Sequence, residues 1–150
     1  IDVTLDYAET LTKTGDYEQA RTVLEDLLRL RQAKGRPHAK ALLALSQNEA
    51  VAGNLKRAVP YAQRVYNVYR AYHDLAAEGY LMSALQLEAL NETVMAYKTL
   101  DEMLANPLMS KLTLANEAKE KRLALLESLP EGALDETAAE IAKLTEEVSE

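Results

Sequence analysis

The clearest pattern in the chain is a set of small and apolar positions that recurs every 38 residues over residues 1–109. Each copy has a turn signal followed by an alanine, which places that alanine on the first turn of a helix. The three copies are Gly15-Asp16 with Ala20, Gly53-Asn54 with Ala58, and Asn91-Glu92 with Ala96. Small residues also recur before each turn and mostly apolar ones after it: Ala8, Ser46 and Ala84, then Leu24, Ala62 and Leu100. The pattern predicts three copies of one structural unit.

The residues of each copy indicate a helical hairpin. Glycine or asparagine can adopt the left-handed backbone that ends a helix. Asp16 and Asn54 are then suited to cap the helix that follows. The small residues before and after each turn allow two antiparallel helices to cross closely. We therefore expect three hairpins with loops of two to three residues.

The register is lost after Met109. Residues 110–129 predict another helix, with Leu114, Ala118, Leu125 and Leu129 on one stripe, and Pro130-Glu131-Gly132 ends it. A last amphipathic helix with an acidic outer face is expected over 134–148. A polar-faced terminal helix suits the capping role that open helical stacks require.

These features resemble the tetratricopeptide repeat family, most closely between Ala8 and Leu27. The family repeat has about 34 residues, so the resemblance is to a long-repeat variant with about one extra helical turn per unit. It implies an all-α fold, a right-handed α-α superhelix of about three helical hairpins plus C-terminal capping helices. The expected helix pairs are about 1–34, 35–74 and 75–109, and residues 110–150 are expected to cap the same domain.

Composition narrows the functional classes. The chain has 150 residues, with 24 Asp and Glu against 17 Lys and Arg, for a net charge of −7. This acidic balance argues against nucleic acid as the main partner. Cysteine is absent, which excludes thiolate chemistry and disulfides. No apolar run is long enough to span a bilayer. A chain that starts at Ile1 is expected to be a processed product or part of something longer. The sequence does not fix the compartment; it slightly favours the cytoplasm, and the periplasm would require a removed leader.

Candidate chemistry is sparse, and we expect no catalytic residue, metal site or cofactor. His38 and His73 lack a second ligand on a helix face, so surface or helix-end positions are expected for both. A basic cluster near the first junction fits helix C-termini better than a nucleic-acid track. The tyrosines between 61 and 80 either pack between repeats or anchor a partner.

The resemblance also implies a binding wall, because the first helix of each hairpin lines the concave side of such stacks. The predicted partner-binding residues are Leu5, Glu9, Thr12, Lys40, Leu43, Gln47, Ala50, Glu78, Leu81, Leu85 and Glu88. A core role remains the alternative for Leu43, Leu81 and Leu85, and the helix expected over 134–148 could fill the groove. Family members that clamp carboxylates use basic and Asn-rich positions on this wall. The matching positions here include Leu5 and Glu9, so no such clamp is expected.

The main functional hypothesis is a non-enzymatic scaffold that binds another protein or peptide segment in a concave helical groove. The alternative is a regulatory or oligomerisation segment of a larger bacterial multidomain protein, such as the sensor arm of a transcription regulator or an assembly protein. That alternative includes self-association. No membrane insertion is expected.

Overall fold

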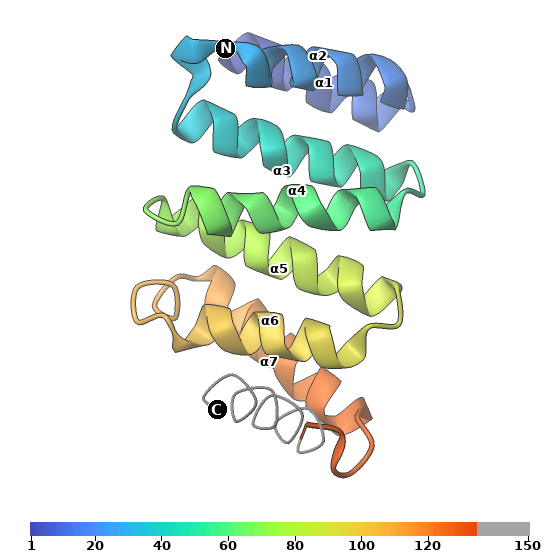
Figure 1. Cartoon of the computed structure of the whole chain (residues 1–150), viewed down its shortest axis with the longest axis vertical. Coiled ribbons are helices and arrows are strands. Elements are labelled where there is room, and N and C mark those ends of the chain that lie inside the picture. Colours follow the sequence, from blue (N-terminus) through green and yellow to red (C-terminus); the bar gives the residue numbers. More distant parts are fainter. Residues whose placement is uncertain (135–150) are drawn as a thin grey trace, which may run out of the picture.

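The computed structural model describes residues 1–134, which form a stack of α-helices with no β-strand among them (Figure 1). The helices are α1 (Asp2–Thr14), α2 (Tyr17–Arg29), α3 (Arg36–Val51), α4 (Leu55–Val68), α5 (His73–Ala89), α6 (Thr93–Ala105) and α7 (Leu114–Ser128). A short 3-10 helix, Arg31–Ala33, joins α2 to α3. None of the described helices is long and apolar enough to cross a membrane. The expected all-helical solenoid is confirmed.

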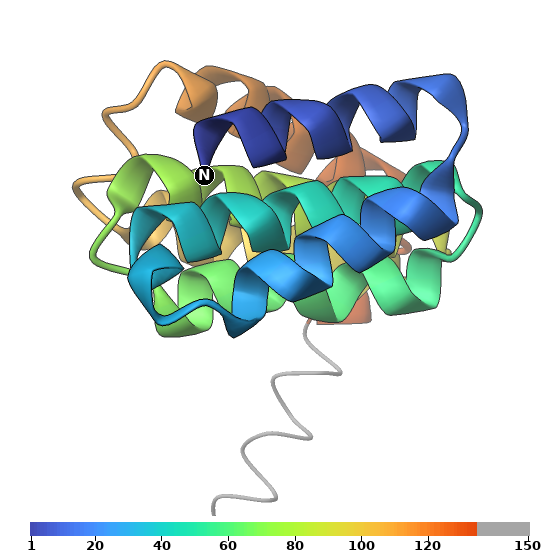
Figure 2. The ribbon, with the colours of Figure 1, turned by 90° about the horizontal axis from the view of Figure 1, so that it is seen from above.

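Successive helices form antiparallel pairs that stack in layers. Each helix packs against the next one along the chain, and the first helices of the pairs also pack on one another, α1 on α3 and α3 on α5. Seen from above, these first helices lie toward one side of the stack and the second helices toward the other (Figure 2). The side formed by α1, α3 and α5 is therefore a continuous wall.

The three turns within the pairs have the same geometry. Gly15, Gly53 and Asn91 adopt φ values of 88°, 90° and 63°, the left-handed conformation that ends a helix. In each turn the following backbone N–H donates to a carbonyl five residues earlier: Asp16 to Leu11, Asn54 to Glu49, and Glu92 to Leu87. Asp16 and Asn54 stand at the N-cap positions, but neither side chain makes the expected capping hydrogen bond. The backbone turn alone therefore accounts for the start of the second helix.

The small residues of the pattern lie where the helices approach most closely. Ala20, Ala58 and Ala96 occupy equivalent places on the first turn of α2, α4 and α6, and all three are fully buried. Gly79 of α5 faces α4 so closely that an added Cβ would lie 2.9 Å from the Ala62 carbonyl oxygen. Close helix contact therefore depends on residue size at these few positions.

Polar side chains are also buried between the pairs. The amide of Asn48 donates to the Tyr17 carbonyl oxygen over 3.0 Å and accepts from Thr12 over 2.9 Å. The amide of Gln86 donates to the Ser46 hydroxyl, which in turn donates to the Ala58 carbonyl oxygen. These bonds tie neighbouring units together.

The C-terminal part departs from the expected bounds. The predicted helix over 110–129 begins only at Leu114, after a turn that follows Pro107, and ends at Ser128. α7 packs against α6 and α5 and buries Ala118 and Leu125. The helix expected over 134–148 lies, from residue 135 on, outside the described residues.

Candidate functional site

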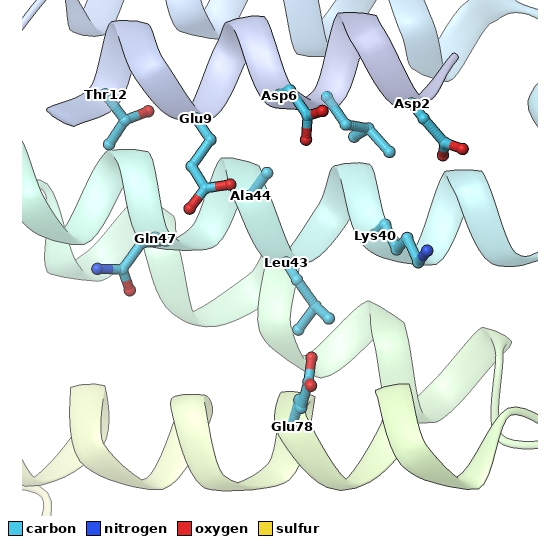
Figure 3. A pocket seen from close by; sticks show the side chains of 10 residues that line it. Asp2, Asp6, Glu9, Thr12, Lys40, Leu43, Ala44, Gln47 and Glu78 are labelled. Carbon is cyan, nitrogen blue, oxygen red and sulfur yellow. The ribbon is translucent and has the colours of Figure 1, made fainter. Parts of the chain in front are cut away.

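A pocket of about 640 Å³ opens on the wall formed by the first helices. It lies between α1 and α3, and Glu78 of α5 borders it on the third side (Figure 3). We call it the acidic groove, and its lining residues are Asp2, Leu5, Asp6, Glu9, Thr12, Lys40, Leu43, Ala44, Gln47 and Glu78.

The acidic groove combines an apolar part with charged groups. Leu5, Leu43 and Ala44 supply apolar contact surface. Asp2, Asp6 and Glu9 extend from α1 toward α3, while Leu43 and Glu78 point toward each other across the gap between α3 and α5 (Figure 3). Lys40 is the remaining charged residue of the lining, so four carboxylates oppose one ammonium group. The groove therefore favours a ligand with positive charge and apolar side chains.

Glu78 is the carboxylate whose ionisation the fold perturbs most clearly in this groove. Burial among its neighbours raises the pKa of Glu78, and the nearby Asp74 carboxylate raises it further, while Arg36 and Lys40 act in the opposite direction. A carboxylate that is partly removed from water and close to another carboxylate gains from an added cation. An added cation next to Glu78 would favour its ionised form.

An ion pair between two units lies one helical turn before Glu78. The guanidinium of Arg36 donates to both carboxylate oxygens of Asp74, over 3.0 and 2.6 Å. This bidentate contact lowers the pKa of Asp74 to about 2. Arg36 also lies 5.5 Å from the centre of the Tyr72 ring. Arg36 is thus engaged by Asp74 and does not line the groove, although its charge still lowers the pKa of Glu78.

We compared the sequence with models of known protein families. The model of the tetratricopeptide repeat matches residues 1–71. This match supports a relationship of residues 1–71 to the tetratricopeptide repeat family. Comparisons with curated proteins and with solved structures found no match. Tetratricopeptide repeats generally mediate protein–protein interaction and are typically non-enzymatic modules. The matched region contains α1, α3 and every groove residue except Glu78.

The acidic groove brings together most of the residues predicted to bind a partner. Those that line it are Leu5, Glu9, Thr12, Lys40, Leu43, Gln47 and Glu78, while Ala50, Leu81, Leu85 and Glu88 lie elsewhere. Their role in binding stays a prediction.

Part of the predicted wall is core instead. Leu81 is only 6% exposed and packs in the main apolar cluster, and Leu43 is 7% exposed although it borders the groove. The cause is packing by other helices: residues of α4, α6 and α7 surround Leu81, while Leu43 packs with Val65 of α4 and Leu75 of α5. Leu85, in contrast, is 40% exposed. Glu88 is paired with Lys121, so α7 reaches the third helix pair.

Sequence reasoning missed Asp2, Asp6 and Ala44, which also line the groove. A signal for the first two was present, because Asp2, Leu5, Asp6 and Glu9 recur at helical spacing and share one face of α1.

His38 lies at a helix end, as expected, and it also takes part in the packing between helices. This residue is in the first turn of α3, yet it is half-buried and both ring nitrogens are engaged. Nε2 bonds to the Leu28 carbonyl oxygen, which can only accept, so Nδ1 accepts from the Tyr69 hydroxyl. His38 therefore joins three helices as a structural residue. Among the described residues, no cluster of three potential ligands could hold a metal ion.

Two tyrosines, one from α4 and one from α5, pack within the protein. Tyr66 and Tyr80 are buried, and their rings stack with centroids 3.8 Å apart. The Tyr80 hydroxyl donates to Glu102 over 2.9 Å. For this pair the packing interpretation is correct.

Proposed function

We propose that this tetratricopeptide repeat chain is a non-enzymatic scaffold, which binds a segment of another protein in the acidic groove. The observation that carries the proposal is the composition of the groove: apolar side chains next to four carboxylates and a single lysine. The segment that fits is amphipathic, with lysine or arginine near Glu9 and Glu78 and apolar side chains on Leu5 and Ala44. A helix or an extended strand can present such a pattern.

The same charges support the absence of a carboxylate clamp. A peptide C-terminus that carries acidic side chains would meet Asp2, Asp6, Glu9 and Glu78, and like charges at close range repel. Lys40 alone does not offset them. Acidic peptides are therefore expected to bind weakly or not at all.

We also propose one domain with three helix pairs, at about 1–34, 35–74 and 75–109, closed by residues 110–150. Support comes from the pairs α1–α2, α3–α4 and α5–α6 and from α7, which lies against the last pair. In this arrangement α7 limits the groove to the first two units and the start of the third.

The proposal is tested with the full chain and two synthetic peptides of 15 residues. One peptide has leucine and lysine in an amphipathic helical pattern, and the other has glutamate in place of lysine. We expect the basic peptide to bind and the acidic one not to bind, by fluorescence anisotropy at low salt. Higher ionic strength should weaken binding, because exposed charges are screened.

Two double variants locate the contact. Glu9→Lys with Glu78→Lys reverses two groove charges and should weaken the basic peptide by roughly tenfold, at about 0.5 to 1 kcal/mol for each reversed contact. Glu120→Lys with Glu127→Lys makes the same charge change on exposed positions of α7, away from the groove. It should change the affinity less than twofold. Equal weakening in both variants would mean that net charge and not the groove attracts the peptide.

The alternative function, a regulatory or oligomerisation segment of a larger bacterial protein, stays a prediction. Exposed apolar residues on α1 favour some form of association. A stable dimer of the isolated chain, measured by light scattering, would support this alternative.

A further inference from the structure

The outer side of α1 carries apolar side chains that no described element covers. Val3 is 81% exposed, Tyr7 is 50% exposed and Ile1 is 43% exposed. Val3 and Tyr7 are four residues apart, so they lie one above the other on one face of the helix. Single exposed apolar side chains are normal on a protein surface. These two are informative because of the positions they occupy in the repeat.

The residues one repeat later are buried. Positions 41 and 45 in α3 correspond to Val3 and Tyr7, and Ala41 and Leu45 are fully buried in a cluster with Leu24 and Leu27 of α2. One repeat further, Gly79 and Ser83 of α5 are buried as well, and Gly79 lies against α4. In both later units this face is where the second helix of the preceding pair packs.

A polar position on the same face shows the same contrast. Asn48 of α3 donates to the Tyr17 carbonyl oxygen of the preceding pair, and Gln86 of α5 donates to Ser46. The equivalent residue in α1 is Thr10, which is exposed and bonds only to the Asp6 carbonyl oxygen of its own helix. α1 therefore has the interface positions of a stacked unit without the helix that covers them.

We propose that a further helical hairpin stacks on this face, with its second helix on α1 as α2 lies on α3. Continuity with the two interfaces inside the chain supports this occupant. Val3 is larger than Ala41 and Gly79, so the axis of the covering helix lies farther from α1 than α2 lies from α3. The proposal does not depend on the acidic groove.

A second copy of the chain is disfavoured on two grounds. α1 has three acids, Asp2, Asp6 and Glu9, and only Lys13 as a base, which pairs with Glu9, so two copies of α1 brought together repel each other through their net charge. The second helix of the last pair, α6, is already covered by α7. A copy can therefore not offer it for head-to-tail stacking.

The test uses the absence of cysteine from the chain. Val3→Cys introduces one exposed thiol, whose rate of reaction with a disulfide reagent reports access to the face. A longer protein is made by placing a copy of residues 1–38, one full repeat, before residue 1 of the whole chain. The only cysteine is at the original position 3. The control is Leu123→Cys in both proteins, an exposed leucine on α7.

We expect the added hairpin to slow the reaction of the thiol at position 3 by at least about tenfold, which corresponds to about 1.4 kcal/mol. The thiol at position 123 should react at an unchanged rate. Tyr7→Asp in the original α1 of the longer protein should restore fast reaction at position 3. Equal rates at position 3 with and without the added hairpin would overturn the proposal. So would a rate that falls with protein concentration in the 150-residue chain, because the occupant would then be a second copy.

Discussion

Replacing Arg21 with alanine should leave Glu49 as a buried carboxylate with too few partners. Glu49 is 1% exposed at the contact between α2 and α3. One of its oxygens accepts from the Arg21 guanidinium, and the other accepts from the Asn54 amide over 2.9 Å. Arg21→Ala removes the only cation that contacts this carboxylate directly.

The expected loss of stability depends on the contacts that Glu49 keeps after the substitution. Removing one partner of a fully buried ion pair costs about 3 to 5 kcal/mol. The Arg21 side chain is 24% exposed and Asn54 still bonds to Glu49, so a loss of about 2 to 4 kcal/mol is expected here. Glu49→Leu should cost less, because Leu11 and Leu87 occupy the equivalent positions of the other units and Arg21 can turn toward water. The double variant should therefore be more stable than Arg21→Ala alone.

The assay is urea unfolding at pH 7, followed by circular dichroism, for the parent and the three variants. A double-mutant cycle isolates the interaction between the two side chains. The reasoning is refuted if Arg21→Ala costs less than about 1 kcal/mol, the range of exposed ion pairs, or if the double variant is the least stable of the set.

The pH dependence gives an independent check. Burial alone would raise the pKa of Glu49, but hydrogen bonds from Arg21 and Asn54 outweigh it, so its pKa in the folded protein is lowered. The stability that this group contributes is present above its unfolded pKa of about 4.3. It is lost as the pH falls through the lower folded value. The parent should consequently lose more stability than Glu49→Leu on acidification below about pH 5.

Three further predictions concern the stack. Gly79→Ala should destabilise the protein by about 1 to 3 kcal/mol in urea unfolding, because its Cβ would meet the Ala62 carbonyl oxygen at 2.9 Å; an unchanged midpoint would mean that α4 and α5 can separate freely. Asn91→Ala should lower the free energy of unfolding by about 1 kcal/mol, since alanine disfavours the φ of 63°. Asn91→Gly is the control, which should not lower it. Asp74→Asn should cost about 0.5 to 1 kcal/mol at pH 7 because the pair with Arg36 is exposed. As the pKa of Asp74 is about 2, thermal unfolding should show this difference vanish only as the pH falls from about 4 toward 2.

Local chemistry made the hairpins predictable from sequence. A glycine or asparagine at a left-handed turn and an alanine five residues later determine the turn and the close crossing, whatever the surroundings. The positions of Gly15, Gly53 and Ala96 therefore agree with the structure. The start of α7 was less predictable, because the turn after Pro107 depends on how the chain leaves α6.

The groove was predictable only in part. Helical spacing shows which residues share a face of α1 or α3, but it does not show how closely α3 and α5 approach. Leu43 is buried against Leu75 of α5, and Leu81 is buried among residues of α4, α6 and α7, which the spacing alone does not place. The pairing of Glu88 with Lys121 depends on the path of α7, which has no counterpart in the repeat pattern. His38 bonds to Leu28 and Tyr69, which lie in other parts of the chain. Local sequence spacing therefore does not predict these contacts.

The buried amides have a consequence for how the units are ordered. Asn48 and Gln86 occupy equivalent positions, yet they use different side-chain partners: Asn48 accepts from the Thr12 hydroxyl, and Gln86 donates to the Ser46 hydroxyl. A chain in which the second and third hairpins exchanged places would keep its apolar surfaces but leave buried amides unpaired, at a cost of about 1 to 3 kcal/mol for each. The hairpins are consequently not interchangeable modules, and duplication or shuffling of units during evolution would have required these contacts to change together.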